Sequence, residues 1–179
     1  MNDAILDAEQ AHLSNLLEAI QRCVFFLEGS ARKLSWPLEA EAIKGRKRDI
    51  TLFESLAAIN ERFAKLQDTL GSAMRHAAML AGEPVDSFLK VLSFYEKSGV
   101  IESVTAWQVY RATRNLAAHD YETDYAEIAE HFNALRGLLP ALYADAARFV
   151  RYCHDTLHIQ PASLDFSEDF IAITRRSTD

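Results

Sequence analysis

The sequence predicts an all-α protein, folded as an antiparallel helical bundle of four to five main helices. Three observations lead to this prediction. The chain has only six glycines and four prolines in 179 residues, too few for the many tight turns of an all-β fold. Apolar residues make up 49% and charged residues 25%, which is the balance of a folded globular domain. Long stretches repeat their apolar residues every three or four positions, the period of a helix.

Residues 3–28 are expected to form the first long helix. Their apolar side chains recur at the i, i+3, i+4, i+7 spacing of one helical face, and the Gly-Ser pair that follows suits a C-terminal stop. The positions on this face are Leu13, Leu16, Leu17, Ile20, Val24 and Leu27.

A long basic connection, residues 29–49, follows this helix. It contains six Lys or Arg and three Asp or Glu, a net charge of +3, whereas the chain as a whole has 19 basic and 26 acidic residues and a net charge of −7. Pro37 is suited to open a short helix that runs through Lys44. Connections of this length in small domains are often functional or mobile. The basic run Lys44–Arg48 therefore has two interpretations, contact with RNA or an acidic partner, and a solvated loop.

Three more helices are expected in the middle of the chain. Residues 50–81 form a long one, which a glycine and a proline close. A short helix covers about 85–95 and ends at a Ser-Gly pair, and another covers 102–119, which contains neither Gly nor Pro. The apolar stripe of the long helix consists of Phe53, Leu56, Phe63, Leu66, Leu70, Met74 and Ala77.

The last long helix is expected over about 124–157. Its apolar residues recur in alternating steps of three and four, which is a heptad pattern. Pro140 cannot donate to the helical hydrogen-bond ladder, so we expect a kink or break near Gly137. The spare apolar surface of this helix, together with Phe25 and Phe26, suits a dimer face. The heptad positions are Tyr125, Ile128, Phe132, Leu135, Leu139, Leu142, Ala146, Phe149 and Cys153.

These helices predict a single domain over residues 1–160, because each can bury its apolar stripe only against the others. The tail, residues 161–179, has weak periodicity and is expected to fray. Cys23 and Cys153 stand at apolar-periodic positions, which indicates buried free thiols. The N-terminal segment lacks the features of a signal peptide, and no apolar run reaches the roughly 18 residues of a membrane span. We therefore expect a cytoplasmic protein with no membrane association.

The acidic net charge limits the functions that the chain can have. Non-specific affinity for nucleic acid comes mostly from Lys and Arg, so any RNA activity requires a local basic patch. One candidate lies near the end of the helix expected over 102–119. Arg111 and Arg114 are i, i+3 neighbours there, and Trp107 precedes Arg111 by one turn. This spacing predicts a small basic platform with an aromatic side chain beside it.

The same segment carries a motif. Arg114, His119 and Tyr121 are spaced as Arg, four residues, His, one residue, Tyr, and Asn115 follows the arginine directly. This pattern, at a helix end in an all-α bundle, resembles the HEPN superfamily, and within it the HepT-like toxins, whose motif is R-x4-H-x-Y. The helix order extends the resemblance loosely over residues 1–157.

The resemblance implies a toxin ribonuclease of a toxin–antitoxin system, an endoribonuclease that cleaves RNA without a metal or other cofactor. Arg114 and His119 would be the catalytic residues, with Arg111 and Asn115 in support, in a composite site between the two protomers of a homodimer. The resemblance also implies a cognate minimal nucleotidyltransferase as antitoxin. That partner would neutralise the toxin by AMPylation of Tyr121.

The chemistry of these side chains is compatible with such a role. Metal-free RNA cleavage needs a base for the 2′-hydroxyl proton and a cation for the phosphorane oxygens; histidine titrates near neutral pH and arginine is always charged. On an ideal helix Arg114 and His119 lie about 140° apart, so either the helix ends before His119 or partners from another chain complete the site. A phenol, with a pKa of about 10, is a poor base at pH 7, so Tyr121 suits a substrate contact or a modification site better.

Other interpretations of the motif are open at this point. Arg114 can pair with Glu122 or Asp124, and His119 can act as a cationic cap at a helix C-terminus. The chain can then be a non-catalytic, substrate-binding accessory subunit of a nucleotidyltransferase, or a plain helical interaction module.

A metal site is the weakest candidate. His154 and His158 have the i, i+4 spacing of a metal-binding pair, but a stable zinc site needs three or four ligands in a defined geometry. No second cluster accompanies the pair, so the sequence favours a solvated helix end and no metal.

Overall fold

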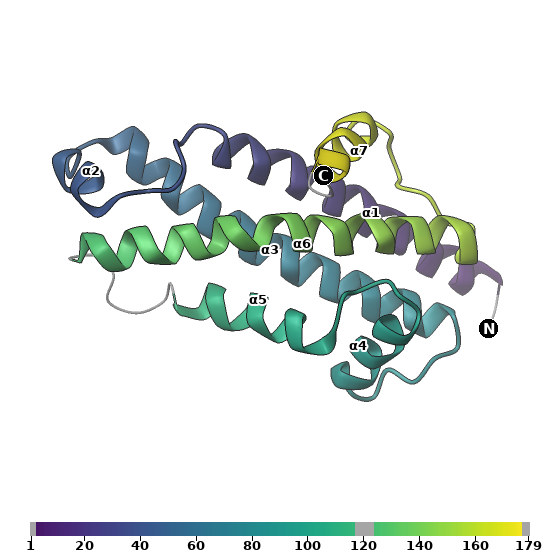
Figure 1. Cartoon of the computed structure of the whole chain (residues 1–179). Coiled ribbons are helices and arrows are strands. Elements are labelled where there is room, and N and C mark those ends of the chain that lie inside the picture. The colour runs from purple at the N-terminus through teal and green to yellow at the C-terminus, as the bar shows by residue number, and fades with distance from the viewer. Residues whose placement is uncertain (1–2, 117–123, 177–179) are drawn as a thin grey trace.

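The computed structural model describes residues 3–116 and 124–176, and all regular structure in these residues is helical. None of their helices combines the length and apolarity that a bilayer-spanning segment requires. The helices, shown in Figure 1, are α1 (Asp3–Ala31), α2 (Ala40–Gly45), α3 (Ile50–Leu80), α4 (Phe88–Lys97), α5 (Val104–Leu116), α6 (Tyr125–Leu157) and α7 (Ser167–Arg176).

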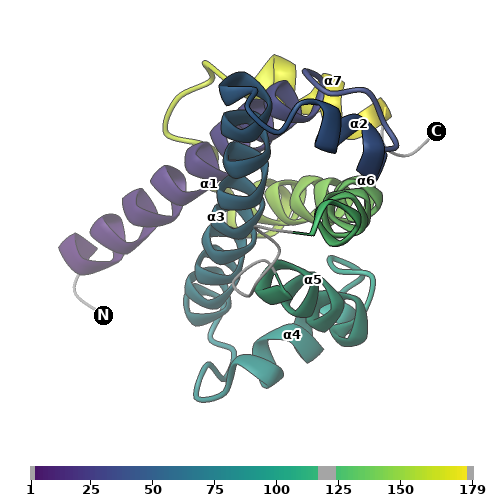
Figure 2. The ribbon, with the colours of Figure 1, turned by 90° about the vertical axis from the view of Figure 1, so that its left-hand side faces the viewer.

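Four of these helices, α1, α3, α5 and α6, form the bundle. Along the chain each runs opposite to the one before it, so the bundle is antiparallel between consecutive long helices (Figure 1). The view from the end shows α7 and α2 on one side of α6, and α4 and α5 on the other (Figure 2). The all-α helical bundle expected from the sequence is confirmed.

The core consists of the apolar stripes that the periodicity predicts. Every residue of the heptad stripe on α6 between Ile128 and Cys153 is buried, so that stripe packs inside the protomer and does not provide a dimer face. Of the two thiols, Cys153 is buried and Cys23 half-buried, and both are free. The fully enclosed side chains include Leu13, Leu17, Ile20, Phe63, Leu66, Leu70, Met74, Leu135, Leu139, Leu142 and Phe149.

The helix α6 passes through Pro140 as one continuous helix, so of the kink or break expected near Gly137 the break is wrong. The reason is the placement of these two residues. Both are exposed, whereas Leu139 and Leu142 beside them are fully buried. Water can therefore replace the hydrogen bond that the proline omits, while core packing holds the helix on both sides of it.

The basic connection is docked on the bundle. The first three residues of 29–49 still belong to α1, so the Gly-Ser pair does not end that helix. The amide of Asn133 on α6 holds both backbone groups of Leu38: its Oδ1 accepts from the Leu38 N–H at 2.8 Å and its Nδ2 donates to the Leu38 carbonyl at 2.9 Å. These bonds hold Leu38 against α6, and the short helix begins at Ala40 instead of Pro37. The run Lys44–Arg48 is exposed.

The C-terminal segment folds where fraying was expected. Residues 167–176 form α7, which packs on α1 and α6 and buries Phe170 and Ile173. The helix is short, so only a few apolar residues mark its buried face and its periodicity is weak in the sequence. Phe166, just before it, lies 5.5 Å from the ring of Phe25 and 6.2 Å from that of Phe26. Phe25 and Phe26, which the sequence suggests for a dimer face, therefore contact the protein's own C-terminal segment.

Candidate functional site

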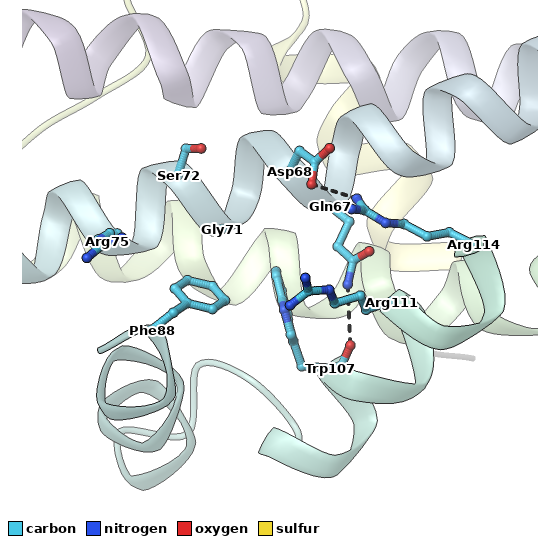
Figure 3. A pocket seen from close by; sticks show the side chains of 9 residues that line it. All are labelled: Gln67, Asp68, Gly71, Ser72, Arg75, Phe88, Trp107, Arg111 and Arg114. Carbon is cyan, nitrogen blue, oxygen red and sulfur yellow. Dashed lines mark hydrogen bonds and ion pairs between the residues drawn. The ribbon is translucent and has the colours of Figure 1, made fainter. Parts of the chain in front are cut away.

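A pocket of about 280 Å³ lies where α5 faces α3 and the start of α4 (Figure 3). From α5 it takes Trp107, Arg111 and Arg114, the three residues that the i, i+3 and i+4 spacing places together. The basic platform with an aromatic neighbour, expected from the sequence, is therefore present. The residues that α3 and α4 contribute are Gln67, Asp68, Gly71, Ser72, Arg75 and Phe88.

Arg114 is held by α3. Its Nη1 donates to Asp68 Oδ1 at 2.6 Å and to the carbonyl of Ala64 at 3.3 Å. The Arg114 side chain is only 19% exposed, whereas Asp68 is 65% exposed. Asp124, one of the two partners considered for Arg114, instead caps α6 by accepting from the N–H of Ala126 at 2.8 Å. The other, Glu122, lies outside the described residues.

The other two arginines of the pocket are arranged differently. Arg75 is exposed and donates to the carbonyl of Val85 at 2.7 Å, which ties α3 to the connection before α4. Arg111 is exposed, and it forms no hydrogen bond or ion pair with any residue of 3–116 or 124–176. The three arginines and one aspartate among the described lining residues sum to a net charge of +2, although the chain has −7. A local cationic site of this kind attracts anions.

The pocket has an apolar floor formed by two aromatic rings. The ring centroids of Phe88 and Trp107 are 6.1 Å apart, in an edge-on arrangement. Gly71 lies directly above them in the middle of α3 (Figure 3), and a Cβ there would stand 3.2 Å from Phe88 and 3.4 Å from Trp107. This close approach accounts for a glycine inside a long helix, where it costs about 1 kcal/mol relative to alanine.

Gln67 is a buried polar residue in the wall of this pocket, and it is only 3% exposed. Its Nε2 donates to the carbonyl of Trp107 at 3.3 Å, and its Oε1 has no hydrogen-bond partner within residues 3–116 and 124–176. A carbonyl can only accept, so the amide nitrogen must face Trp107 and the amide oxygen is the group left over. An unsatisfied buried acceptor is uncommon in folded proteins and requires a specific explanation.

The remaining residues of the motif are only partly described. Asn115 is exposed near the end of α5. His119 and Tyr121 lie outside the described residues, so their distances from Arg114 are not part of the structure. The helix α5 extends at least to Leu116.

Residues 3–116 and 124–176 contain no group of three His, Cys, Asp or Glu side chains arranged for a metal ion. The two histidines considered for a metal serve other contacts. His154 Nδ1 lies 2.7 Å from Asp155 Oδ1, and His158 ends α6 with a left-handed backbone conformation, φ 58°.

Sequence reasoning missed the residues that α3 contributes. Gln67, Gly71 and Arg75 stand four residues apart on one face of that helix, beside Asp68. Two signals were available: a glycine in the interior of a long helix, and a polar glutamine directly after Leu66 on the apolar stripe. Neither signal identifies α5 as the facing element, because that requires the packing of the two helices.

A second polar group, which is buried, lies where α5 packs against α6. Asp145 on α6 is 1% exposed and accepts from the backbone N–H of Glu102 at 3.1 Å and from the hydroxyl of Tyr110 at 3.2 Å. It also pairs with Arg148, whose Nε donates to the carbonyl of Val100 at 2.9 Å. Burial raises the pKa of Asp145 to about 6. This network fastens the start of α5 to α6.

Comparison with known proteins adds no relative: no family model, no curated protein and no solved structure matches the chain.

Proposed function

We propose that the protein is a metal-independent endoribonuclease, the toxin of a toxin–antitoxin pair, with Arg114 and His119 as its catalytic residues. The observation that carries the proposal is the position of the cationic pocket. In a chain of net charge −7, Arg111 and Arg114 share a pocket whose described lining residues have a net charge of +2. The R-x4-H-x-Y motif begins at Arg114, and its histidine and tyrosine follow it in the sequence.

The chemistry assigns a separate task to each residue. Arg114 binds a phosphate oxygen and stabilises the charge that develops on the phosphorane, because a guanidinium is always protonated and matches phosphate geometry. His119 removes the proton of the attacking 2′-hydroxyl and returns one to the leaving oxygen. Arg111, which has no partner among the described residues, supports phosphate binding, and Asn115 contacts substrate at the rim.

A homodimer completes the site in this proposal. One protomer supplies a single Arg and a single His, and a two-fold axis brings two of each into one cleft. Tyr121 stands two residues after His119, and a cognate minimal nucleotidyltransferase blocks the cleft by attaching AMP to it. The phosphodiester of that AMP carries the negative charge that Arg111 and Arg114 attract.

The test is an RNA digest by the purified protein and by two variants, Arg114→Ala and His119→Ala. We expect wild-type cleavage in the presence of EDTA, products that end in 2′,3′-cyclic phosphate, and loss of cleavage in both variants. Arg151→Ala is the matched control, because Arg151 is exposed on α6 and does not line the pocket. Cleavage that requires a metal and leaves 5′-phosphates would contradict the Arg–His mechanism.

A second candidate is a non-catalytic, substrate-binding subunit of a nucleotidyltransferase. One observation favours it: Asp68 already neutralises Arg114, at 2.6 Å. An arginine engaged in this way suits a binding wall as well as a catalytic role. RNA binding without any cleavage, in the presence of a neighbouring transferase, distinguishes this candidate from the first.

A further inference from the structure

Three features of the pocket are not needed for Arg–His chemistry. Gln67 presents a buried amide oxygen without a hydrogen-bond partner among the described residues. Arg75 stands one helical turn beyond Gly71 and adds a third guanidinium. Phe88, which is half-buried, and Trp107, which is only 4% exposed, form an apolar floor under the glycine. A cleavage site requires only the cation and the base, so these features point to a ligand group that is held beside the reacting phosphate.

The charge of the pocket indicates the charge of the bound group. Arg75 and Arg111 are both exposed and line the same pocket with Arg114, and among the lining residues that the structure describes Asp68 is the one acid. Since Asp68 is engaged with Arg114 at 2.6 Å, the guanidinium of Arg111 is the one without a partner in the described chain. Guanidinium groups bind phosphate through paired, charge-assisted hydrogen bonds. The ligand is therefore an anion, and a phosphate in particular.

The apolar floor and Gln67 indicate that the ligand also carries a flat ring with a hydrogen-bond donor. Aromatic side chains bind flat, apolar groups, and a nucleobase gains affinity by stacking on an aromatic ring. The oxygen of Gln67 is an acceptor with less than 1 Å² of exposed surface, so only a donor that enters the pocket, or a shift of Arg111, can satisfy it. A bare phosphate offers no N–H at neutral pH, and a cationic amine is disfavoured by the net charge of +2. A nucleobase offers a flat ring and an N–H together.

We infer that this pocket binds a single nucleotide unit, with its phosphate on Arg75 and Arg111 and its base against the half-buried ring of Phe88, where the Gln67 amide oxygen accepts a hydrogen bond from a base N–H. The inference deepens the proposed function and rests on it in one respect: the nucleotide is taken to be part of the RNA substrate. Gln67 is then a specificity residue, which contacts the base and not the scissile phosphate. The volume of about 280 Å³ lies just below the range of about 300–1,000 Å³ of typical ligand pockets, and suits one nucleotide rather than several.

The test is calorimetric titration of the full chain carrying His119→Ala, which removes turnover, with four probes. The probes are the four nucleoside 5′-monophosphates as one class, ribose 5-phosphate, an unphosphorylated nucleoside and inorganic phosphate. We expect the nucleotides to bind at least about tenfold more tightly than ribose 5-phosphate, since the base adds stacking on the floor. We expect inorganic phosphate and the nucleoside each to bind more weakly than the complete nucleotide.

Two variants separate the phosphate from the base. Arg75→Gln keeps an N–H donor for the carbonyl of Val85 but removes the charge, and it should weaken every phosphate probe by about tenfold. Gln67→Leu removes the acceptor, and it should reduce nucleotide affinity toward that of ribose 5-phosphate and leave ribose 5-phosphate unchanged. Arg151→Ala is the control of equal charge change and should alter none of the affinities. Circular dichroism establishes that each variant folds.

The outcomes are distinct. Equal affinity of nucleotides, ribose 5-phosphate and inorganic phosphate would reduce the pocket to a simple anion site and overturn the inference, as would a Gln67→Leu protein with wild-type nucleotide affinity. Competition between a short oligoribonucleotide and a bound mononucleotide assigns the unit to RNA, and binding of the mononucleotide alone assigns it to a free nucleotide. RNA cleavage without nucleotide binding defeats this inference only, and nucleotide binding without cleavage defeats the ribonuclease proposal only.

Discussion

Two arginine–carboxylate groups flank α5, one where it meets α6 and one where it meets α3, and they differ in how completely their polar atoms are satisfied. Towards α6, Asp145 accepts from a backbone N–H and a tyrosine hydroxyl and pairs with Arg148, and it is 1% exposed. Towards α3, Asp68 pairs with Arg114 but is 65% exposed, and an amide oxygen of Gln67 beside it has no partner among the described residues.

The difference indicates what each group is for. A buried carboxylate with all its hydrogen bonds made belongs to the folding of the protein, because loss of one partner leaves an uncompensated charge. A half-open cluster in which one guanidinium and one acceptor have no partner among the described residues can offer those groups to a ligand. The same types of side chain therefore serve structure where α5 meets α6 and, in our proposal, binding where it meets α3.

The largest expected effect is a loss of stability when the buried Asp145 group is disrupted. Asp145→Ala leaves Arg148 without its carboxylate and should lower the free energy of unfolding by about 3–5 kcal/mol. Asp68→Ala, which removes an exposed partner, should lower it by less than about 1 kcal/mol. Urea unfolding followed by circular dichroism measures both. Equal losses in the two variants would show that exposure does not separate the two groups.

The next effect concerns activity on the open side. Arg114→Ala and His119→Ala should each reduce RNA cleavage by at least about a hundredfold, since each removes a charge-stabilising or proton-transfer group. The melting temperature of Arg114→Ala should change by only a few degrees, because its main contact is the exposed Asp68. An unfolded Arg114→Ala protein would instead give this arginine the structural role of Arg148.

A pH series examines the buried side more finely. Burial raises the pKa of Asp145 from 3.8 to about 6, so the folded protein binds this proton more tightly than the unfolded chain. The stability that the folded protein gains from this tighter proton binding at Asp145 is fully present below pH 3.8 and is lost as the pH rises through 6. Between about pH 4 and pH 6, the stability of wild type relative to Asp145→Asn should fall by at most about 1.4 kcal/mol per pH unit.

Urea unfolding at several pH values measures this difference. His131, whose pKa is lowered by burial, is present in both proteins and its effect cancels. A stability difference that does not vary with pH would mean that Asp145 does not titrate in this range.

The smallest expected effect is a change in ligand affinity when the exposed Asp68 loses its charge. Asp68→Asn removes the acid of the pocket and frees Arg114 for an incoming phosphate, so affinity for a nucleoside monophosphate should rise about two- to fivefold, as expected for one exposed ion pair of at most about 1 kcal/mol. Asp155→Asn is the matched control, because that aspartate is exposed at the far end of α6 and pairs with His154. Titration calorimetry measures both, and a loss of affinity in Asp68→Asn would make the aspartate part of the ligand contact.

The sequence predicts the local parts of this molecule well. The stripes that include Leu17, Phe63 and Phe132 are buried as their period indicates, because burial of one helical face follows from residues three or four apart. The grouping of Trp107, Arg111 and Arg114 in one pocket follows from the same spacing. The break expected near Pro140 and the fraying expected in the tail show the limit of this reasoning. The exposure of the proline keeps α6 continuous, and the packing of α7 on the bundle orders the tail.

The tertiary structure alone decided which helix faces which. Arg114 pairs with Asp68, 46 positions earlier in the chain, and the amide of Asn133 hydrogen-bonds to Leu38, 95 positions earlier. Such pairs depend on how whole helices pack, and no local period encodes them. The sequence by itself determined the helices, their buried faces and the cluster on α5. Only the packing of α3 against α5 placed Gln67, Asp68 and Arg75 beside that cluster, because a pocket between helices is formed by surfaces that each helix contributes separately.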